Sequence, residues 1–317
     1  MTLTSRSALS LPSAPVPNVL VVLLLAAGLA ACQSSGDEPA SESGPPVVEV
    51  RALDYAFVAP DTIRPGWTTL RLNNETAEEI HEIDLSRLPE EATYADFEKT
   101  FPVWDTITER VQAGELVGPG EVYKAAGPML PDWAPAEAIT GRGLVSPGRT
   151  AEKTVYLEPG TYAMYCFVKA PDGRAHLAKG MSRRLVVSGD STGASEPEAD
   201  VEVTVGSGAV DQEGALSPGT NTISARFDEE SKGYQTIHLI RVEDDTDLEA
   251  VEQWQNWYTE DGLMAPAPAE FLGGGTVQSE RSKGDVAYFS VEDLEPGQYA
   301  WAVWTFERAF TETVTVE

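Results

Sequence analysis

Cys166, His176 and Met181 follow one another closely in the 317-residue chain, within one segment that also contains two glycines and a proline. A thiolate, an imidazole and a thioether together form a soft donor set, which suits copper. The chain has three histidines, so His81 and His238 are the other imidazoles that could join this set. The segment therefore predicts a metal site that needs one further histidine.

The N-terminal region predicts export and attachment to a membrane through lipid. An apolar run from Val19 to Leu29 follows a single positive charge at Arg6, and small residues come directly before Cys32. This order is typical of a secretory signal, and the run is too short to span a bilayer. Leu-Ala-Ala-Cys resembles the lipobox of bacterial lipoproteins, which implies cleavage before Cys32 and acylation of that residue. An ordinary cleaved secretion signal is the alternative.

These features divide the first part of the chain into a lipoprotein signal peptide over residues 1–31 and a flexible tether over residues 32–46. The tether has almost no apolar side chains with which to offset the cost of ordering. We therefore expect an extracytoplasmic protein of the cell envelope, held at a membrane by its lipid. If the envelope has two membranes, Gln33 after the lipidated cysteine favours the outer one.

The chain has two cysteines, so lipidation of Cys32 would leave Cys166 as the one remaining thiol. In an oxidising compartment such a thiol has no intramolecular disulfide partner. Cys166 is then either an inert cysteine of the hydrophobic core or a metal ligand. Taken alone, Cys166 favours the inert core cysteine, since an unpaired cysteine is among the most buried residue types.

An internal repeat predicts the architecture. Leu157-Glu158-Pro159-Gly160-Thr161-Tyr162-Ala163 returns as Leu294-Glu295-Pro296-Gly297-Gln298-Tyr299-Ala300, each after an alternating strand-like run. We expect the Pro-Gly pair of both copies to form a hairpin turn. Upstream, Ile80-His81 matches Ile237-His238, and each match precedes a helix with a cap-like start, at Thr93 and at Thr246.

The repeats predict an all-β fold with a minor helical part, built as two tandem β-sandwiches. The first sandwich is expected over residues 47–188 and the second over 200–317, with a polar linker at 189–199 that glycine and proline interrupt. The segment between Val111 and Thr150 is not assigned to an element of this pattern.

The first repeat resembles the cupredoxin family of Greek-key sandwiches, on the pattern of His81 after Asn73-Asn74 and a late cysteine, histidine and Gly-Met. The resemblance implies one type 1 (blue) copper ion held by His81, Cys166, His176 and Met181. Nine residues separate Cys166 from His176, more than in the short-loop carriers of the family and close to the long loop of copper nitrite reductases. A turn at 171–173 would fold this loop back onto the cysteine.

The second repeat has Val303 in place of Cys166, and neither histidine nor methionine follows it. We expect a degenerate copy that binds no metal. Three histidines also cannot build the additional copper sites of multicopper oxidases, so we expect no enzyme and no small-molecule substrate. Two function classes remain open, an electron-transfer protein with a redox partner protein and a metal-free surface or scaffold module.

The charge balance restricts the partners. The chain carries 51 acidic against 22 basic side chains, a formal net charge of −29 at pH 7. Such a surface repels polyanions, so nucleic acid is excluded as a partner. Basic proteins are favoured instead.

Overall fold

The computed structural model describes residues 44–317, except 135–136, 142, 207, 228–233 and 279–285. The signal peptide and Cys32 lie outside the described residues, as does most of the tether. The described residues belong to one compact unit. Within the described part of the chain, no helix is long and apolar enough to cross a membrane.

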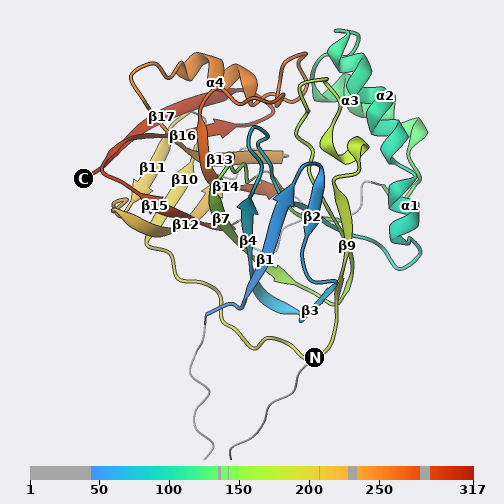
Figure 1. Ribbon diagram of the computed structural model, residues 1–317, viewed down its shortest axis with the longest axis horizontal. Helices are drawn as coiled ribbons and strands as arrows, with labels where there is room; N and C mark the ends of the chain where they lie inside the picture. Colours follow the sequence, from blue (N-terminus) through green and yellow to red (C-terminus); the bar gives the residue numbers. More distant parts are fainter. Residues whose placement is uncertain (1–43, 135–136, 142, 207, 228–233, 279–285) are drawn as a thin grey trace, which may run out of the picture. The chain divides into compact units, whose positions relative to one another are not determined.

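Among its described residues, the first repeat has nine strands and three α-helices. Figure 1 labels most of them. Its strands are β1 (Val47–Leu53), β2 (Ala56–Val58), β3 (Thr62–Ile63), β4 (Gly66–Asn74), β5 (Asp84–Arg87), β6 (Glu137–Thr140), β7 (Thr150–Leu157), β8 (Gly160–Tyr165) and β9 (Ser182–Val187). Its helices are α1 (Tyr94–Glu98), α2 (Phe101–Gln112) and α3 (Gly118–Ala126), with short 3-10 turns η1 (Gly127–Met129) and η2 (His176–Lys179).

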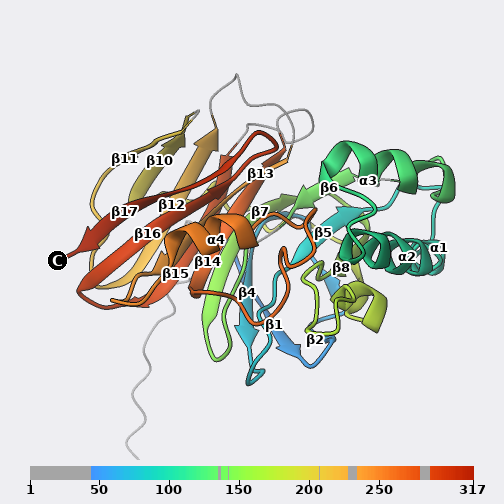
Figure 2. The same ribbon diagram turned by 90° about the horizontal axis from the view of Figure 1, so that it is seen from above.

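The described part of the second repeat contains eight strands and one helix. The strands are β10 (Val201–Val205), β11 (Val210–Glu213), β12 (Gly219–Phe227), β13 (Tyr234–Arg241), β14 (Glu270–Gln278), β15 (Val286–Leu294), β16 (Gly297–Trp304) and β17 (Ala309–Val316). The helix is α4 (Leu248–Trp254), which packs on β16 and β17 (Figure 2).

Each repeat is a sandwich of two sheets with the same strand plan. In the first, β4 pairs with β1 in parallel and with β7 antiparallel, and in the second β12 pairs with β10 and β15 in the same way. The facing sheets are β3-β9-β8-β5-β6 and β14-β13-β16-β17. Alternate residues of β10 are buried, because one face of its sheet covers the core. The predicted class, all-β with minor helix in two tandem sandwiches, is confirmed.

A continuous sheet runs through both repeats. β15 pairs antiparallel with β7, from Tyr288 opposite Thr154 to Val291 opposite Ala151, which makes one eight-stranded sheet, β11-β10-β12-β15-β7-β4-β1-β2. Trp257 and Phe271 of the second repeat belong to the same hydrophobic cluster as Cys166. The two repeats therefore share backbone pairing and a core, while the limits proposed above for the domains stay a prediction.

The Pro-Gly turns are not hairpin turns, and that expectation is wrong. They carry the chain from β7 to β8 and from β15 to β16, and in each case the two strands belong to different sheets. The tyrosine that follows closes the corner, since Tyr162 Oη donates to Glu158 O at 2.7 Å and Tyr299 Oη donates to Glu295 O at 2.9 Å. A sandwich needs such a crossing wherever consecutive strands face each other.

The N-caps of both helices lie within one residue of the predicted positions. Thr93 caps α1 and forms a reciprocal capping box with Asp96. α4 is capped by Asp247, whose side chain accepts from Ala250 N, while Thr246 Oγ1 accepts from Glu243 N. The reciprocal capping box is therefore found at α1, and the side chain of Asp247 caps α4.

Lys153 is a buried cation between the sheets of the first repeat. It is 7% exposed, and its Nζ donates to Gly141 O at 2.8 Å. Burial lowers its pKa to about 8, against the opposing effect of the Asp84 and Glu82 carboxylates. Its protonated form is thus less favourable in the folded protein than in the unfolded chain.

This burial predicts a pH-dependent stability. Because the unfolded chain keeps the Lys153 proton up to pH 10.5 and the folded protein up to about pH 8, the burial cost is complete below pH 8 and fades between the two values. The stability advantage of Lys153→Met over the wild type should therefore shrink by about 3 kcal/mol between pH 7.5 and pH 10.5. Urea unfolding at several pH values measures it, and a difference independent of pH would contradict it.

Candidate metal centre

Cys166 comes directly after β8, where the strand ladder gives way to the ligand loop. Its backbone N–H donates to Met181 O at 3.2 Å, and its carbonyl accepts from Leu177 N at 2.9 Å. Phe167 N donates to Glu82 Oε1 at 3.2 Å. These hydrogen bonds fix the cysteine between both ends of its own loop.

The ligand loop folds back on itself, as the sequence predicts. A tight turn centred on Asp172 is closed by Gly173 N donating to Ala170 O at 2.8 Å, with Gly173 in the left-handed region at φ 81°. His176 N then donates to Val168 O at 2.8 Å and begins the 3-10 turn η2. α2 packs against η2, so the helices of the first repeat support this loop from outside.

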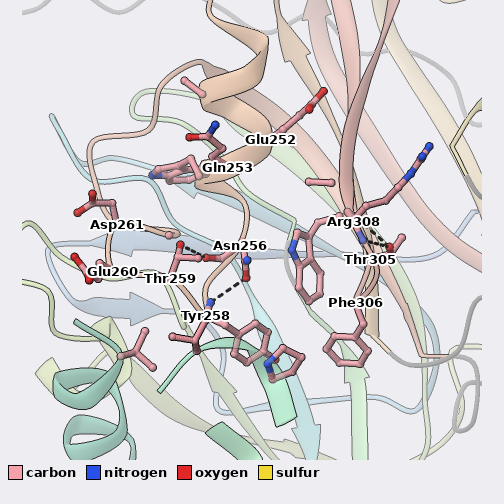
Figure 3. Close-up of a pocket in the computed structure, with 18 of the residues that line it drawn as sticks. Glu252, Gln253, Asn256, Tyr258, Thr259, Glu260, Asp261, Thr305, Phe306 and Arg308 are labelled. Atoms are coloured by element: carbon pink, nitrogen blue, oxygen red, sulfur yellow. Dashed lines mark hydrogen bonds between the residues drawn. The ribbon is translucent and has the colours of Figure 1, made fainter. Parts of the chain in front are cut away.

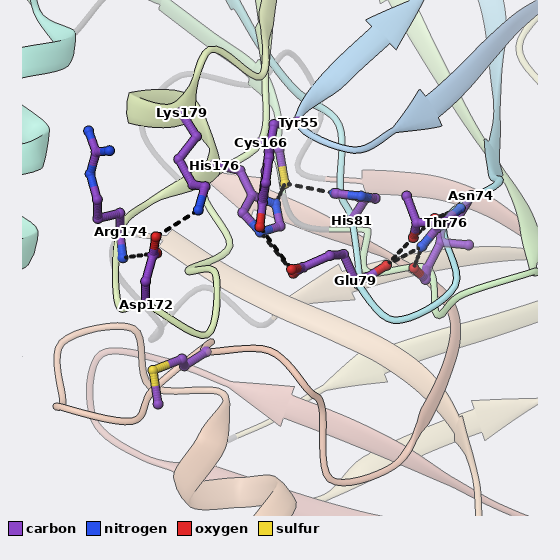
Figure 4. Close-up of polar contacts among 12 residues, drawn as sticks. Tyr55, Asn74, Thr76, Glu79, His81, Cys166, Asp172, Arg174, His176 and Lys179 are labelled. Atoms are coloured by element: carbon purple, nitrogen blue, oxygen red, sulfur yellow. Dashed lines mark hydrogen bonds and ion pairs between the residues drawn. The ribbon is translucent and has the colours of Figure 1, made fainter.

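The structure brings three of the four predicted ligands into one cluster. Cys166 Sγ lies 3.4 Å from His176 Nδ1 and 3.8 Å from His81 Nδ1 (Figure 4). The donor atoms of all three residues lie within 4.8 Å of one another, and the three side chains are 0% exposed. Residues 85 positions apart in the chain thus meet at one end of the sandwich.

The spacing of these donor atoms fits a single soft ion. Metal–sulfur and metal–nitrogen bonds of about 2.3 and about 2.0 Å place sulfur and nitrogen roughly 3.5 to 3.7 Å apart at tetrahedral to trigonal angles. The two observed separations bracket that range. His81 Nε2 is also buried, with no hydrogen-bond partner among the described residues. A thiolate with two imidazoles is a donor set that copper accepts.

Met181, the fourth predicted ligand, stands next to this cluster. Its N–H donates to His176 O at 2.9 Å, its carbonyl accepts from Cys166 N, and its side chain is completely buried in the hydrophobic cluster that contains Cys166. The backbone therefore ties Met181 to both loop ligands. Gly180, at φ 102°, makes the bend that precedes it.

Glu79 supports His176 from the side away from the thiol. Its Oε2 lies 3.2 Å from His176 Nε2, and its Oε1 accepts from Tyr55 Oη at 2.9 Å. Its main-chain carbonyl accepts from the side chains of Asn74 and Thr76 (Figure 4). A carboxylate at Nε2 favours the tautomer that leaves Nδ1 free to bind a metal. Sequence reasoning missed Glu79, because one acid among 51 carries no signal of its own.

Burial keeps the ligands uncharged when no ion is bound. It lowers the pKa of His81 to about 3, with a further contribution from nearby His176, and it also lowers the pKa of His176 against the effect of Glu79. Burial raises the pKa of the Cys166 thiol well above its usual range, and the Glu82 carboxylate adds to the rise. An ion entering this site must therefore displace the thiol proton.

Strand register gives a different equivalence between the two repeats than the sequence match does. Tyr162 and Tyr299 are equivalent corner residues, and counting along the strands from them places Asp84 opposite Tyr165 and His238 opposite Ala302. His238 thus occupies the position of Asp84, three residues beyond that of His81. The expectation that the two histidines are equivalent is wrong, because β13 begins earlier relative to its partner strand than β5 does. His81 forms a single β-bridge with Val145, and the histidine of the second repeat is not its equivalent.

The comparisons with known proteins concern solved structures, since no family model and no curated protein matches the sequence. The chain is similar to auracyanin of the photosynthetic bacterium Roseiflexus castenholzii, at 20% identity and a TM-score of 0.28 over 46% of this chain and 100% of that chain. Auracyanin A of Chloroflexus aurantiacus, described as a "blue" copper protein, has 22% identity and a TM-score of 0.29 over the same shares. A multi-copper oxidase of Pediococcus acidilactici has 11% identity and a TM-score of 0.22 over 86% of this chain and 55% of that one.

Proposed function

We propose that this protein is a lipid-anchored, extracytoplasmic electron carrier with one type 1 copper ion held by His81, Cys166, His176 and Met181. The observation that carries the proposal is the buried Sγ and two Nδ1 atoms, which face one another at 3.4 and 3.8 Å. When bound to such a set, copper accepts and releases a single electron.

The protein's part is to hold the donor atoms still. The 3-10 turn, the Cys166–Met181 backbone pair and the Glu79 contact restrict the loop ligands, and His81 is bridged to Val145. A donor set fixed in this way keeps nearly the same geometry in both oxidation states, which favours rapid electron exchange. With four protein ligands there is no open position for a reacting molecule, so electron transfer is favoured over catalysis.

The proposed location rests on features of the sequence. The apolar run and Leu-Ala-Ala-Cys at the N-terminal end support an anchor at Cys32, and the acidic tether that follows would let the folded part reach neighbouring proteins. A net charge of −29 supports a basic redox partner rather than nucleic acid.

Copper titration of the purified metal-free protein, followed by cycles of reduction with ascorbate and reoxidation, tests this function. We expect one copper per chain and a reversible one-electron change in absorption and electron paramagnetic resonance. A protein that stays folded and binds no copper would instead support the metal-free scaffold.

Glu79→Gln should weaken copper binding about 10- to 100-fold, because neutral glutamine polarises and orients His176 less well. Tyr55→Phe removes the hydroxyl that donates to the far oxygen of Glu79 and contacts Lys179, but it keeps the carboxylate at His176, so it should have a smaller effect. Competition with a copper chelator measures both affinities. Equal affinity in Glu79→Gln and wild type would show that the carboxylate does not position the ligand.

A further inference from the structure

A buried centre needs a defined path to the surface if it exchanges electrons with another protein. Cys166, His81 and His176 are all 0% exposed, so none of these ligands presents an edge to solvent. The following inference rests on the proposed function and concerns where an electron would leave the protein.

A series of aromatic rings leads from Cys166 into the second repeat. Phe167, the next residue, accepts a hydrogen bond at its carbonyl from Trp257 Nε1 at 3.0 Å, and their rings are 5.3 Å apart. The Tyr258 ring lies 5.6 Å from that of Trp257 and 5.8 Å from that of Trp304. Phe306 follows at 5.4 Å from Trp304 and is 36% exposed.

The series ends in a groove of about 930 Å³ (Figure 3). Its lining includes Tyr258, Trp304 and Phe306. Trp304 ends β16, and the turn from β16 to β17 that carries Phe306 has the place in the strand order that the ligand loop has between β8 and β9. Lys169, three residues after Cys166, donates from Nζ to Thr259 O of the groove wall at 2.8 Å. The groove is thus tied to the cysteine segment by hydrogen bonds as well as by rings.

The groove is strongly acidic. Five carboxylates line it and one guanidinium opposes them: Glu249, Glu252, Glu260, Asp261, Glu307 and Arg308. Glu260 and Asp261 are exposed side chains of the loop after α4, whereas Glu252 accepts hydrogen bonds from Thr311. A groove lined by aromatic rings and by an excess of carboxylates complements a positively charged protein surface.

We propose that this groove docks a basic one-electron redox protein, and that Trp257, Tyr258 and Trp304 carry electrons between it and Cys166. One electron leaves the reduced centre and enters the oxidised cofactor of the partner, so the centre is oxidised and the partner reduced. No covalent bond forms or breaks, and no proton moves.

Tyr55 marks a competing exit, because its ring lies 5.0 Å from that of His176 and is partly exposed. There, however, the Lys179 ammonium lies over the ring at 4.3 Å and pairs with Asp172 at 2.7 Å, so this exit lacks the excess of carboxylates that lines the groove. The groove combines a ring series with the charge that such a partner requires.

Docking can be measured without copper. The probe is a basic c-type cytochrome, titrated into the metal-free protein at low ionic strength. Glu260→Gln/Asp261→Asn should weaken binding by at least about fivefold. The matched control is Glu202→Gln/Glu213→Gln, an exposed acidic pair facing each other on β10 and β11, which should change it by less than about twofold. Equal weakening by both pairs, or by neither, would overturn the groove as the docking site.

Stopped-flow oxidation of the copper(I) protein by the same cytochrome tests the path. Trp304→Leu should slow it at least tenfold with an unchanged visible spectrum, while Tyr156→Leu, an exposed ring outside the series, should not. An unchanged rate in Trp304→Leu would overturn the path. Ferricyanide is the control oxidant, because it needs no basic docking face. If the wild-type protein shows no copper spectrum, the proposed function is wrong. The docking measurement needs no copper and would still show whether the groove binds the cytochrome.

Discussion

Replacing Trp257 by alanine is expected to lower the free energy of unfolding by about 3 to 5 kcal/mol. The indole is 2% exposed, it donates to Phe167 O, and the Lys169 ammonium lies 4.9 Å from its ring centre. Alanine would leave a cavity between the second repeat and the cysteine segment, and it would leave Phe167 O without this donor. Urea-induced unfolding of the metal-free protein measures the loss.

Two further variants show how much of that loss comes from the hydrogen bond and how much from burial. Trp257→Phe keeps most of the packing and loses the hydrogen bond, so it should cost about 1 to 3 kcal/mol. Tyr156→Ala, at a ring that is 52% exposed, should cost much less than Trp257→Ala. A loss below 1 kcal/mol for Trp257→Ala would mean that the contact between the repeats contributes little.

Copper binding is expected to stabilise the folded protein by about 4 kcal/mol when free copper exceeds the dissociation constant a thousandfold. The reason is that His81 and the segment from Cys166 to Met181 come together only in the folded chain, so an unfolded chain offers a weaker site. Thermal unfolding with and without copper measures the gain.

His176→Ala is the control for this gain, since it removes one donor and leaves the sheets intact. It should lose most of the copper-dependent stabilisation. His238→Asn, in the second repeat, should keep it. A gain in His176→Ala equal to that of the wild type would show that copper binds elsewhere on the acidic surface.

Local sequence features predicted the architecture because its corners and turns are formed by residues that lie close together in the chain. The repeated Leu-Glu-Pro-Gly segment marks the same sheet-to-sheet corner in both halves, and Tyr162 and Tyr299 close it with the same hydrogen bond. The proximity of Cys166 to His176 was also predictable, since a turn at Gly173 suffices to fold the loop. The choice of His81 as the further histidine needed the family resemblance as well, because 85 residues separate it from the cysteine.

Other features depend on contacts between distant segments, which no local pattern encodes. The pairing of β15 with β7 makes one sheet of two repeats, and the register joins residues more than 130 positions apart in the chain. The support of His176 by Glu79 depends on where a loop turns. The match of His81 with His238 failed for a related reason, since strand register is set by pairing and not by similar letters.

The visible absorption of the copper-loaded protein tests the central claim most directly. A copper ion bonded to the Cys166 thiolate predicts an intense thiolate-to-copper band in the oxidised protein, lost on reduction and absent from folded Cys166→Ser under the same loading. The same weak spectrum in both proteins, with their fold intact, would contradict the assignment of this cluster as a type 1 copper site.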